Sequence, residues 1–170
     1  MHEPTDTGAR LVLLIDTDAA TRTAVRPLLA PYGLELIQAR AGVAALELLQ
    51  RMPDRFRLVL LSMEMPGLPG AVLIETLRLL RPDLAIMCLT ADRATVAGGG
   101  DNCLLKPLRA EELRSQIEMA LAGGDLGLPA ATVAADAVAR ARASYVATGN
   151  LLEAAREIAL GMPGEPAGDW

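Results

Sequence analysis

Five short, mainly apolar runs, each separated from the next by a helical pattern, most constrain the fold of this chain. The runs are 11–15, 34–38, 58–61, 84–89 and 103–105. Apolar residues repeat three and four positions apart between the first four runs, at 19–30, 42–52 and 70–80, and again after the last run, at 110–121. Continuous apolar runs are typical of strands that are buried on both faces of a parallel sheet. The alternation therefore predicts an α/β fold, a doubly wound five-stranded parallel sheet with helices on both faces.

Two places interrupt this pattern. Pro27 lies inside the first helical segment, where proline lacks an N–H and collides with the carbonyl four residues earlier, so we expect a kink or a late helix start. The segment 91–101 is short and contains three consecutive glycines, which are poor helix formers. We therefore expect a shortened helix between the fourth and fifth strands.

Charge and aromatic content bound the kind of partner. The net charge is −5, with 16 basic and 21 acidic residues, and aromatic residues make up 2% of the 170-residue chain. Nucleic acids and anionic membranes attract basic surfaces, and single strands also stack on aromatic rings, so neither is expected as a partner. No apolar run approaches the roughly 20 residues of a membrane span, and the first ten residues do not resemble a signal peptide. We expect protein partners and a cytoplasmic location.

The two cysteines, Cys88 and Cys103, both lie inside apolar runs. Thiols stay reduced in the cytoplasm, and buried free cysteines behave as small apolar residues. We therefore interpret both as core residues and expect neither a disulfide framework nor a metal site.

The chain divides into a first domain, 10–123, and a tail, 124–170, at the glycine pair 123–124. Two helical segments follow, 132–147 and 151–160, and Asn150 and Glu153 have the spacing of a helix cap and its partner. The tail is therefore predicted to form a helical hairpin with an irregular end. Its apolar face needs cover from the first domain or from a second copy, which favours a homodimer; this face comprises Val133, Val138, Tyr145, Leu151, Leu152 and Ile158.

Polar side chains follow four of the predicted strands and should meet at one edge of the sheet. These residues are Asp16, Thr17, Asp18, Ser62, Thr90 and Lys106. Together with Arg22, the Met65-Pro66-Gly67 turn and the Lys106-Pro107 pair, they resemble the receiver domain of two-component response regulators, over about 10–122. The resemblance implies a flavodoxin-like fold with strand order 2-1-3-4-5, and a non-enzymatic role in phosphorelay signal transduction.

In that family an aspartate after the third strand accepts a phosphoryl group from a histidine kinase, and a magnesium ion bridges it to an acidic pair. The acceptor position corresponds to Ser62, and the acidic pair to Asp16 and Thr17. A hydroxyl forms no acyl phosphate, and hard cations need charged oxygens. Asp18 should point away from the pocket toward the first helix. The resemblance thus implies a degenerate acceptor, with magnesium bound weakly or not at all and no other metal or cofactor.

The resemblance assigns two remnants of phosphate binding, the switch hydroxyl Thr90 and the ammonium group of Lys106. We expect Lys106 to pair with Asp16, or with Glu64 if its side chain turns inward, although Glu64 is interpreted as a solvated loop residue. Cys103 stands where the family usually has a switch aromatic residue. The spacing from Thr90 to Lys106 is also nearly two helical turns shorter than in the family.

These departures together predict a pseudo-receiver that acts through phosphorylation-independent protein contacts. Direct phosphorylation of Ser62 is the less favoured alternative, because the only histidine is His2 and no activating base lies nearby in the sequence. The other alternative is a DNA-binding transcriptional regulator. Residues 149–160 resemble the first helix of a factor-for-inversion-stimulation type helix-turn-helix, and also half of a tetratricopeptide-type hairpin, but the last ten residues contain two prolines and no basic residue.

Overall fold

The computed structural model describes residues 10–94, 103–123 and 133–163. Five parallel strands form one sheet in the order β2-β1-β3-β4-β5. Their bounds are β1 Leu11–Ile15, β2 Glu35–Ala39, β3 Phe56–Ser62, β4 Ala85–Thr90 and β5 Cys103–Leu105. The predicted fold class and strand order are confirmed. The predicted shortening of the helix between β4 and β5 falls on residues outside the described ones.

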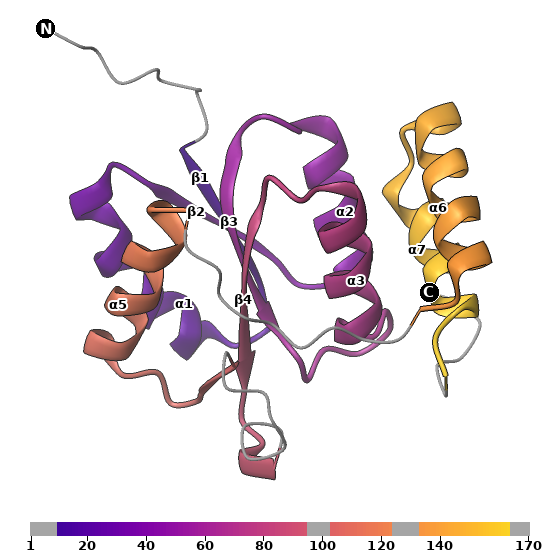
Figure 1. Ribbon diagram of the computed structural model, residues 1–170. Helices are drawn as coiled ribbons and strands as arrows, with labels where there is room; N and C mark the ends of the chain where they lie inside the picture. Colours follow the sequence, from indigo (N-terminus) through magenta and orange to yellow (C-terminus); the bar gives the residue numbers. More distant parts are fainter. Residues whose placement is uncertain (1–9, 95–102, 124–132, 164–170) are drawn as a thin grey trace, which may run out of the picture.

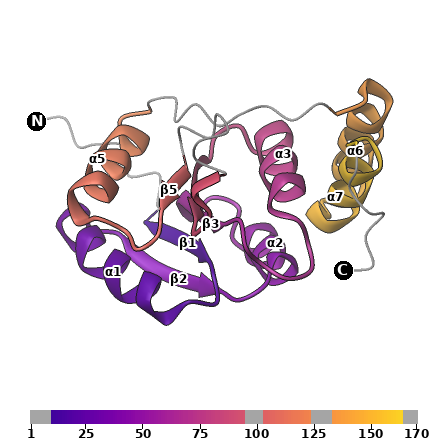
Figure 2. The ribbon, with the colours of Figure 1, turned by 90° about the horizontal axis from the view of Figure 1, so that it is seen from below.

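In the described part of the chain, four helices cover the two faces of the sheet: α1 Ala19–Leu29, α2 Gly42–Arg51, α3 Gly70–Leu80 and α5 Ala110–Leu121. Helices α1 and α5 lie on one face, and α2 and α3 lie on the other (Figure 2). Side chains alternate between the faces along each strand. Val12 and Leu14 of β1 therefore pack with α1 and α5, whereas Leu13 and Ile15 pack with α2 and α3. Burial on both faces explains the continuous apolar runs.

Helix α1 contains Pro27 and nevertheless begins at Ala19 and continues to Leu29. The expectation of a late helix start is therefore wrong. The helix starts directly after Asp18, which caps it by accepting a hydrogen bond from the Ala20 N–H at 2.9 Å. A 3-10 turn, η1 Ala30–Tyr32, begins three residues after Pro27.

The tail forms the predicted helical hairpin, α6 Ala135–Thr148 and α7 Leu151–Leu160. Gly149 ends α6 with a φ of 67°, a left-handed conformation that glycine adopts without steric cost. Asn150 then caps α7 by accepting from the N–H groups of Leu152 at 3.0 Å and Glu153 at 3.3 Å. Glu153 was expected to contact the Asn150 N–H in return. Instead, the Asn150 N–H donates to Thr148 Oγ1 at 3.1 Å.

The hairpin packs against the α2–α3 face of the sheet domain, outside α3 (Figure 1). Helix α7 is the inner helix, and its buried residues Leu151, Ala155 and Ile158 share one apolar cluster with Leu73 and Leu77 of α3. Gln50 of α2 accepts a hydrogen bond from the Leu151 N–H at the start of α7. Cover for the apolar face of the hairpin thus comes from the same chain.

Cys88 and Cys103 form a disulfide, so the expectation of two reduced core residues is wrong. The physical reason is the strand register. Cys88 of β4 pairs directly with Cys103 of β5, and their Cα atoms are 4.4 Å apart. Spacing along the chain gave no sign of this pairing, since adjacency of two strands is a tertiary property. The cysteines consequently no longer support a reducing compartment.

Reduction of this disulfide should lower the free energy of unfolding by about 2–3 kcal/mol, because the bond closes a short loop in the unfolded chain. The two cysteines are 15 residues apart in sequence. Urea unfolding with and without dithiothreitol measures the difference. A Cys88→Ala/Cys103→Ala variant is the control, and its free energy of unfolding should be the same with and without dithiothreitol. Equal stability of the wild-type chain in both conditions would contradict the expectation.

Among the described residues, no helix combines the length and apolarity needed to cross a membrane.

Candidate functional site

The polar residues singled out in the sequence gather at the carboxyl ends of β1, β3, β4 and β5. Asp16, Ser62 and Thr90 are almost fully buried there, with exposed fractions of 3%, 1% and 0%. Each directly follows or ends a strand that is mainly apolar, so the sheet itself carries them to one edge. The structure brings together four of the predicted residues, the fourth being Lys106.

Asp16 accepts hydrogen bonds at both carboxylate oxygens and at its carbonyl oxygen. Its Oδ2 atom accepts a hydrogen bond from Lys106 Nζ at 2.6 Å, and its Oδ1 atom accepts from the Asp18 N–H at 3.0 Å. Gln38 of β2 donates from Nε2 to the Asp16 carbonyl oxygen at 2.7 Å. The Lys106 and Asp16 side chains are 14% and 4% exposed. The predicted internal ion pair is therefore present, in an environment that screens it little.

Ser62 lies between this ion pair and a second carboxylate. Lys106 Nζ donates to Ser62 Oγ at 3.1 Å, and Ser62 Oγ donates to Glu64 Oε2 at 3.3 Å. The hydroxyl thus has one donor and one acceptor as neighbours, which uses its hydrogen and one lone pair. Asp16, Lys106, Ser62 and Glu64 form one continuous chain of hydrogen bonds.

Glu64 lies in the loop after β3, as expected, and its side chain turns inward. The residue as a whole is exposed, but its carboxylate turns back to the end of β4. Oε1 accepts from Thr90 Oγ1, in a short contact, and from the Ala91 N–H at 2.8 Å. Burial disfavours the charged carboxylate, yet the hydrogen bonds from Thr90 and Ala91 outweigh this effect together and lower the pKa of Glu64 below its ordinary value.

A signal for Glu64 was present in the sequence. Ser62 and Glu64 are two positions apart, and side chains alternate along an extended chain, so both point to the same side if the strand direction continues. The proline and glycine that follow predict a turn instead, in which the Glu64 side chain is expected to face solvent. Gln38 was also missed, because it acts from β2, which carries none of the predicted site residues.

Thr17 and Asp18 stand apart from the cluster. Both are exposed. Asp18 points to the first helix, as predicted, where its side chain accepts from the Ala20 N–H and from Thr21 Oγ1. The Ala20 hydrogen bond is the main reason that the pKa of Asp18 lies below its ordinary value. Asp18 therefore serves as a helix cap.

The donor set does not fit a magnesium ion. Asp16 is the only carboxylate of the expected acidic pair, and both of its oxygens already accept hydrogen bonds, one of them from an ammonium group. Ser62 supplies a neutral hydroxyl. Within the described part of the chain, no group of three or more His, Cys, Asp or Glu side chains could hold a metal ion. Weak or absent magnesium binding stays a prediction, derived from charge and coordination.

Cys103, at the position of the switch aromatic residue, is 7% exposed and bonded to Cys88. The cross-link ties β5 to β4 next to Thr90, because the pair Thr90–Leu105 lies two residues further along the same ladder. The peptide bond between Lys106 and Pro107 is cis. A ring that swings between two positions has no counterpart at residue 103.

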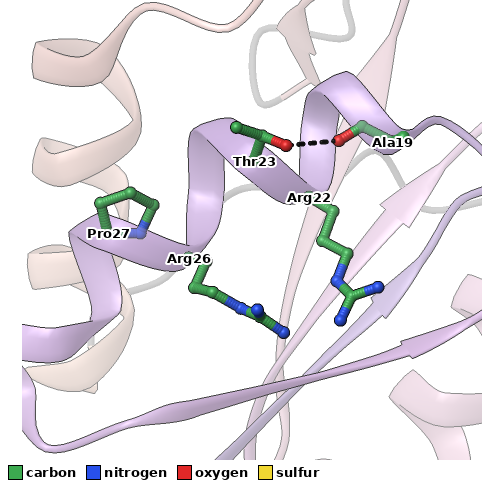
Figure 3. A pocket seen from close by; sticks show the side chains of 5 residues that line it. All are labelled: Ala19, Arg22, Thr23, Arg26 and Pro27. Atoms are coloured by element: carbon green, nitrogen blue, oxygen red, sulfur yellow. Dashed lines mark hydrogen bonds between the residues drawn. The ribbon is translucent and has the colours of Figure 1, made fainter.

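A separate pocket of about 490 Å³ lies along α1, lined by Ala19, Arg22, Thr23, Arg26 and Pro27. Arg22 and Arg26 extend to the same side of the helix (Figure 3). Thr23 Oγ1 donates to the Ala19 carbonyl oxygen at 3.0 Å and does not turn toward the arginines. The pocket shares no lining residue with the strand-end cluster.

Comparison with known proteins gives one consistent result. The response regulator receiver domain matches residues 12–118. The response regulator MprA of Mycobacterium leprae is 37% identical over 116 residues, which cover 65% of this chain and 50% of that protein. The transcriptional regulatory protein CpxR homolog of Haemophilus influenzae is 36% identical over 118 residues, or 65% of this chain and 49% of that protein. This chain thus spans about half the length of these two relatives.

Solved structures agree. The signal receiver domain of an HD domain-containing protein from Pseudomonas fluorescens Pf-5 superposes with a TM-score of 0.57 and 25% identity, covering 68% of this chain and 96% of that one. The match to the receiver domain family ends before the hairpin, since residues 12–118 precede α6.

Proposed function

Because the chain belongs to the response regulator receiver domain family, we propose that it is a two-component signalling module that acts through protein contacts without being phosphorylated. The observation that carries this proposal is Ser62 at the end of β3, with Lys106 bound to both Ser62 and Asp16. Phosphoryl transfer in this fold relies on positioning and on charge neutralisation. In this chain, the positive charge of Lys106 is already neutralised by Asp16.

The chemistry of the acceptor supports the same proposal. An acyl phosphate needs a carboxylate, whereas a serine hydroxyl needs a base to remove its proton. Ser62 Oγ has an ammonium group on one side and the Glu64 carboxylate at 3.3 Å on the other. Ser62 is 1% exposed, so an incoming phosphoryl donor has little access to its hydroxyl.

Incubation with radiolabelled acetyl phosphate and magnesium is the direct test. The wild-type chain is expected to incorporate no label above that of a Ser62→Ala variant. Thr17→Asp/Ser62→Asp, which restores the acidic pair and the acceptor, is expected to incorporate magnesium-dependent label at a rate at least about tenfold above background, the equivalent of about 1.4 kcal/mol in transition-state stabilisation. Wild-type label that requires Ser62 and magnesium would overturn the proposal.

Partners follow from the family and from the charge of the chain. We propose that it contacts a histidine kinase, another regulator or an output protein. The homodimer expected from the tail remains a proposal, and any dimer must use a surface other than the apolar face of α7, which packs on α2 and α3. Analytical ultracentrifugation of the purified chain tests the dimer.

A DNA-binding role is the second candidate, favoured by one observation: the CpxR homolog that this chain resembles is named a transcriptional regulatory protein. Helix α7, the candidate first helix of a helix-turn-helix, packs on the sheet domain through its buried face. The residues expected at the position of a reading helix are 161–170; residues 161–163 form turns, and 164–170 lie outside the described part of the chain. A gel-shift assay at physiological salt without a complex would remove this candidate.

A further inference from the structure

The carboxylate of Glu64 occupies a place where donors from two neighbouring strands converge. Thr90 Oγ1 and the Ala91 N–H, both at the end of β4, donate to Oε1, and Ser62 Oγ at the end of β3 donates to Oε2. Thr90 is fully buried and Ser62 nearly so. Both oxygens of the carboxylate are therefore bound, although the backbone of Glu64 belongs to an exposed loop.

Glu64 is the acceptor for all three donors. Ser62 Oγ receives its own hydrogen bond from Lys106, so its hydrogen is left to donate to Glu64. Thr90 Oγ1 likewise accepts from the Asp92 N–H at 3.0 Å and donates to Glu64. Two hydroxyls polarised in this way and one backbone N–H, with Lys106 behind Ser62, make an anion site.

We propose that Glu64 is the resident anion of this strand-end pocket, a tethered carboxylate that fills the place an external oxyanion would take. This proposal deepens the phosphorylation-independent function above and rests on it. The carboxylate reaches the site from a position two residues beyond Ser62, so it is present at a high effective concentration that an external anion must exceed. Its negative charge also repels a second anion at the same place.

The consequence is a pocket held in one state. Glu64 joins the end of β3 to Thr90 and Ala91 at the end of β4, and the Cys88–Cys103 disulfide joins β4 to β5. The strand ends that would otherwise respond to a bound phosphoryl group are therefore connected to one another within the chain. A ligand shifts such an arrangement only if it binds one state better than the other, and here the internal carboxylate already supplies that preference.

The test is a titration with inorganic phosphate without magnesium, followed by amide NMR of Thr90 and Ala91. Lys106 is the only lysine of the chain, so selective lysine labelling gives one further signal from the pocket. Glu64→Ala is expected to bind phosphate at millimolar concentrations, with shifts at all three residues. The wild-type chain should require at least about tenfold more phosphate, because Glu64 competes. Glu64→Gln, which keeps the acceptor oxygen and loses the charge, should fall between them.

Glu47→Ala is the matched control, since Glu47 is an exposed glutamate on α2. It should titrate as the wild type does. Unchanged signals elsewhere in the spectrum establish that the variants fold. Equal phosphate affinity of wild type and Glu64→Ala would overturn the proposal, and so would a Glu64→Ala variant that binds no phosphate. Either result leaves the acetyl phosphate test unaffected, because this titration involves no magnesium and no covalent transfer.

Discussion

Replacing Lys106 with methionine is expected to lower the free energy of unfolding by about 4 kcal/mol, because it leaves the buried Asp16 carboxylate without its cation. Asp16 is 3% exposed, and its Oδ2 atom lies 2.6 Å from Lys106 Nζ. Methionine keeps most of the length and apolar surface of the lysine side chain, so the loss reports on charge. Urea unfolding monitored by circular dichroism measures the change.

The double variant Asp16→Asn/Lys106→Met is the control. Removing both charges should restore most of the lost stability, to within about 1 kcal/mol of the wild type, because a buried ion pair and a neutral pair of similar volume are often nearly equivalent. A single variant that loses less than about 1 kcal/mol would contradict the expectation, since that is the value of a solvent-screened surface pair.

Replacing Ala155 with arginine is expected to force α7 off its neighbours. Ala155 is fully buried in the middle of α7, in the apolar cluster that the helix shares with α2 and α3. An unpaired guanidinium there costs several kcal/mol, about 4 kcal/mol as a working figure. Amide hydrogen exchange in α7, and on the facing residues of α2 and α3, should therefore accelerate by about a thousandfold.

Leu160→Arg is the matched control, because Leu160 belongs to the same helix and is 60% exposed. It should change the free energy of unfolding by less than about 0.5 kcal/mol. In the Ala155→Arg variant, the amides of α1 and α5 should keep their protection, since the cluster that contains Val25, Leu29 and Leu113 includes no hairpin residue. Uniform loss of protection throughout the chain would instead mean that the hairpin and the sheet domain unfold together.

The fold was readable from the sequence because its signals are local. A strand buried on both faces must be apolar at every position, and Leu11–Ile15 shows this pattern without any knowledge of its neighbours. The cap at Asn150 is equally local, since the donors and the acceptor lie within three residues. Strand order was not readable in this way and came from resemblance to the receiver family.

The site was readable in part. Asp16, Ser62, Thr90 and Lys106 were placed at one edge by the rule that parallel strands end together, and the Lys106–Asp16 pair follows from opposite charge in a buried place. The contacts of Glu64 could not be predicted in the same way, because they depend on how the loop after β3 folds back toward Thr90 and Ala91. The disulfide was missed because it depends on which strands are neighbours.

By itself, the sequence determined the element types, the alternating α/β architecture, the helical hairpin and the absence of a carboxylate at residue 62. These follow from periodicity and from side-chain chemistry, which act over a few residues. Only the tertiary structure decided that α7 packs on α2 and α3, that Cys88 meets Cys103 and that Glu64 contacts Thr90. Each of these contacts joins residues of different elements, and the chain entropy lost in making them is recovered only when the whole core assembles.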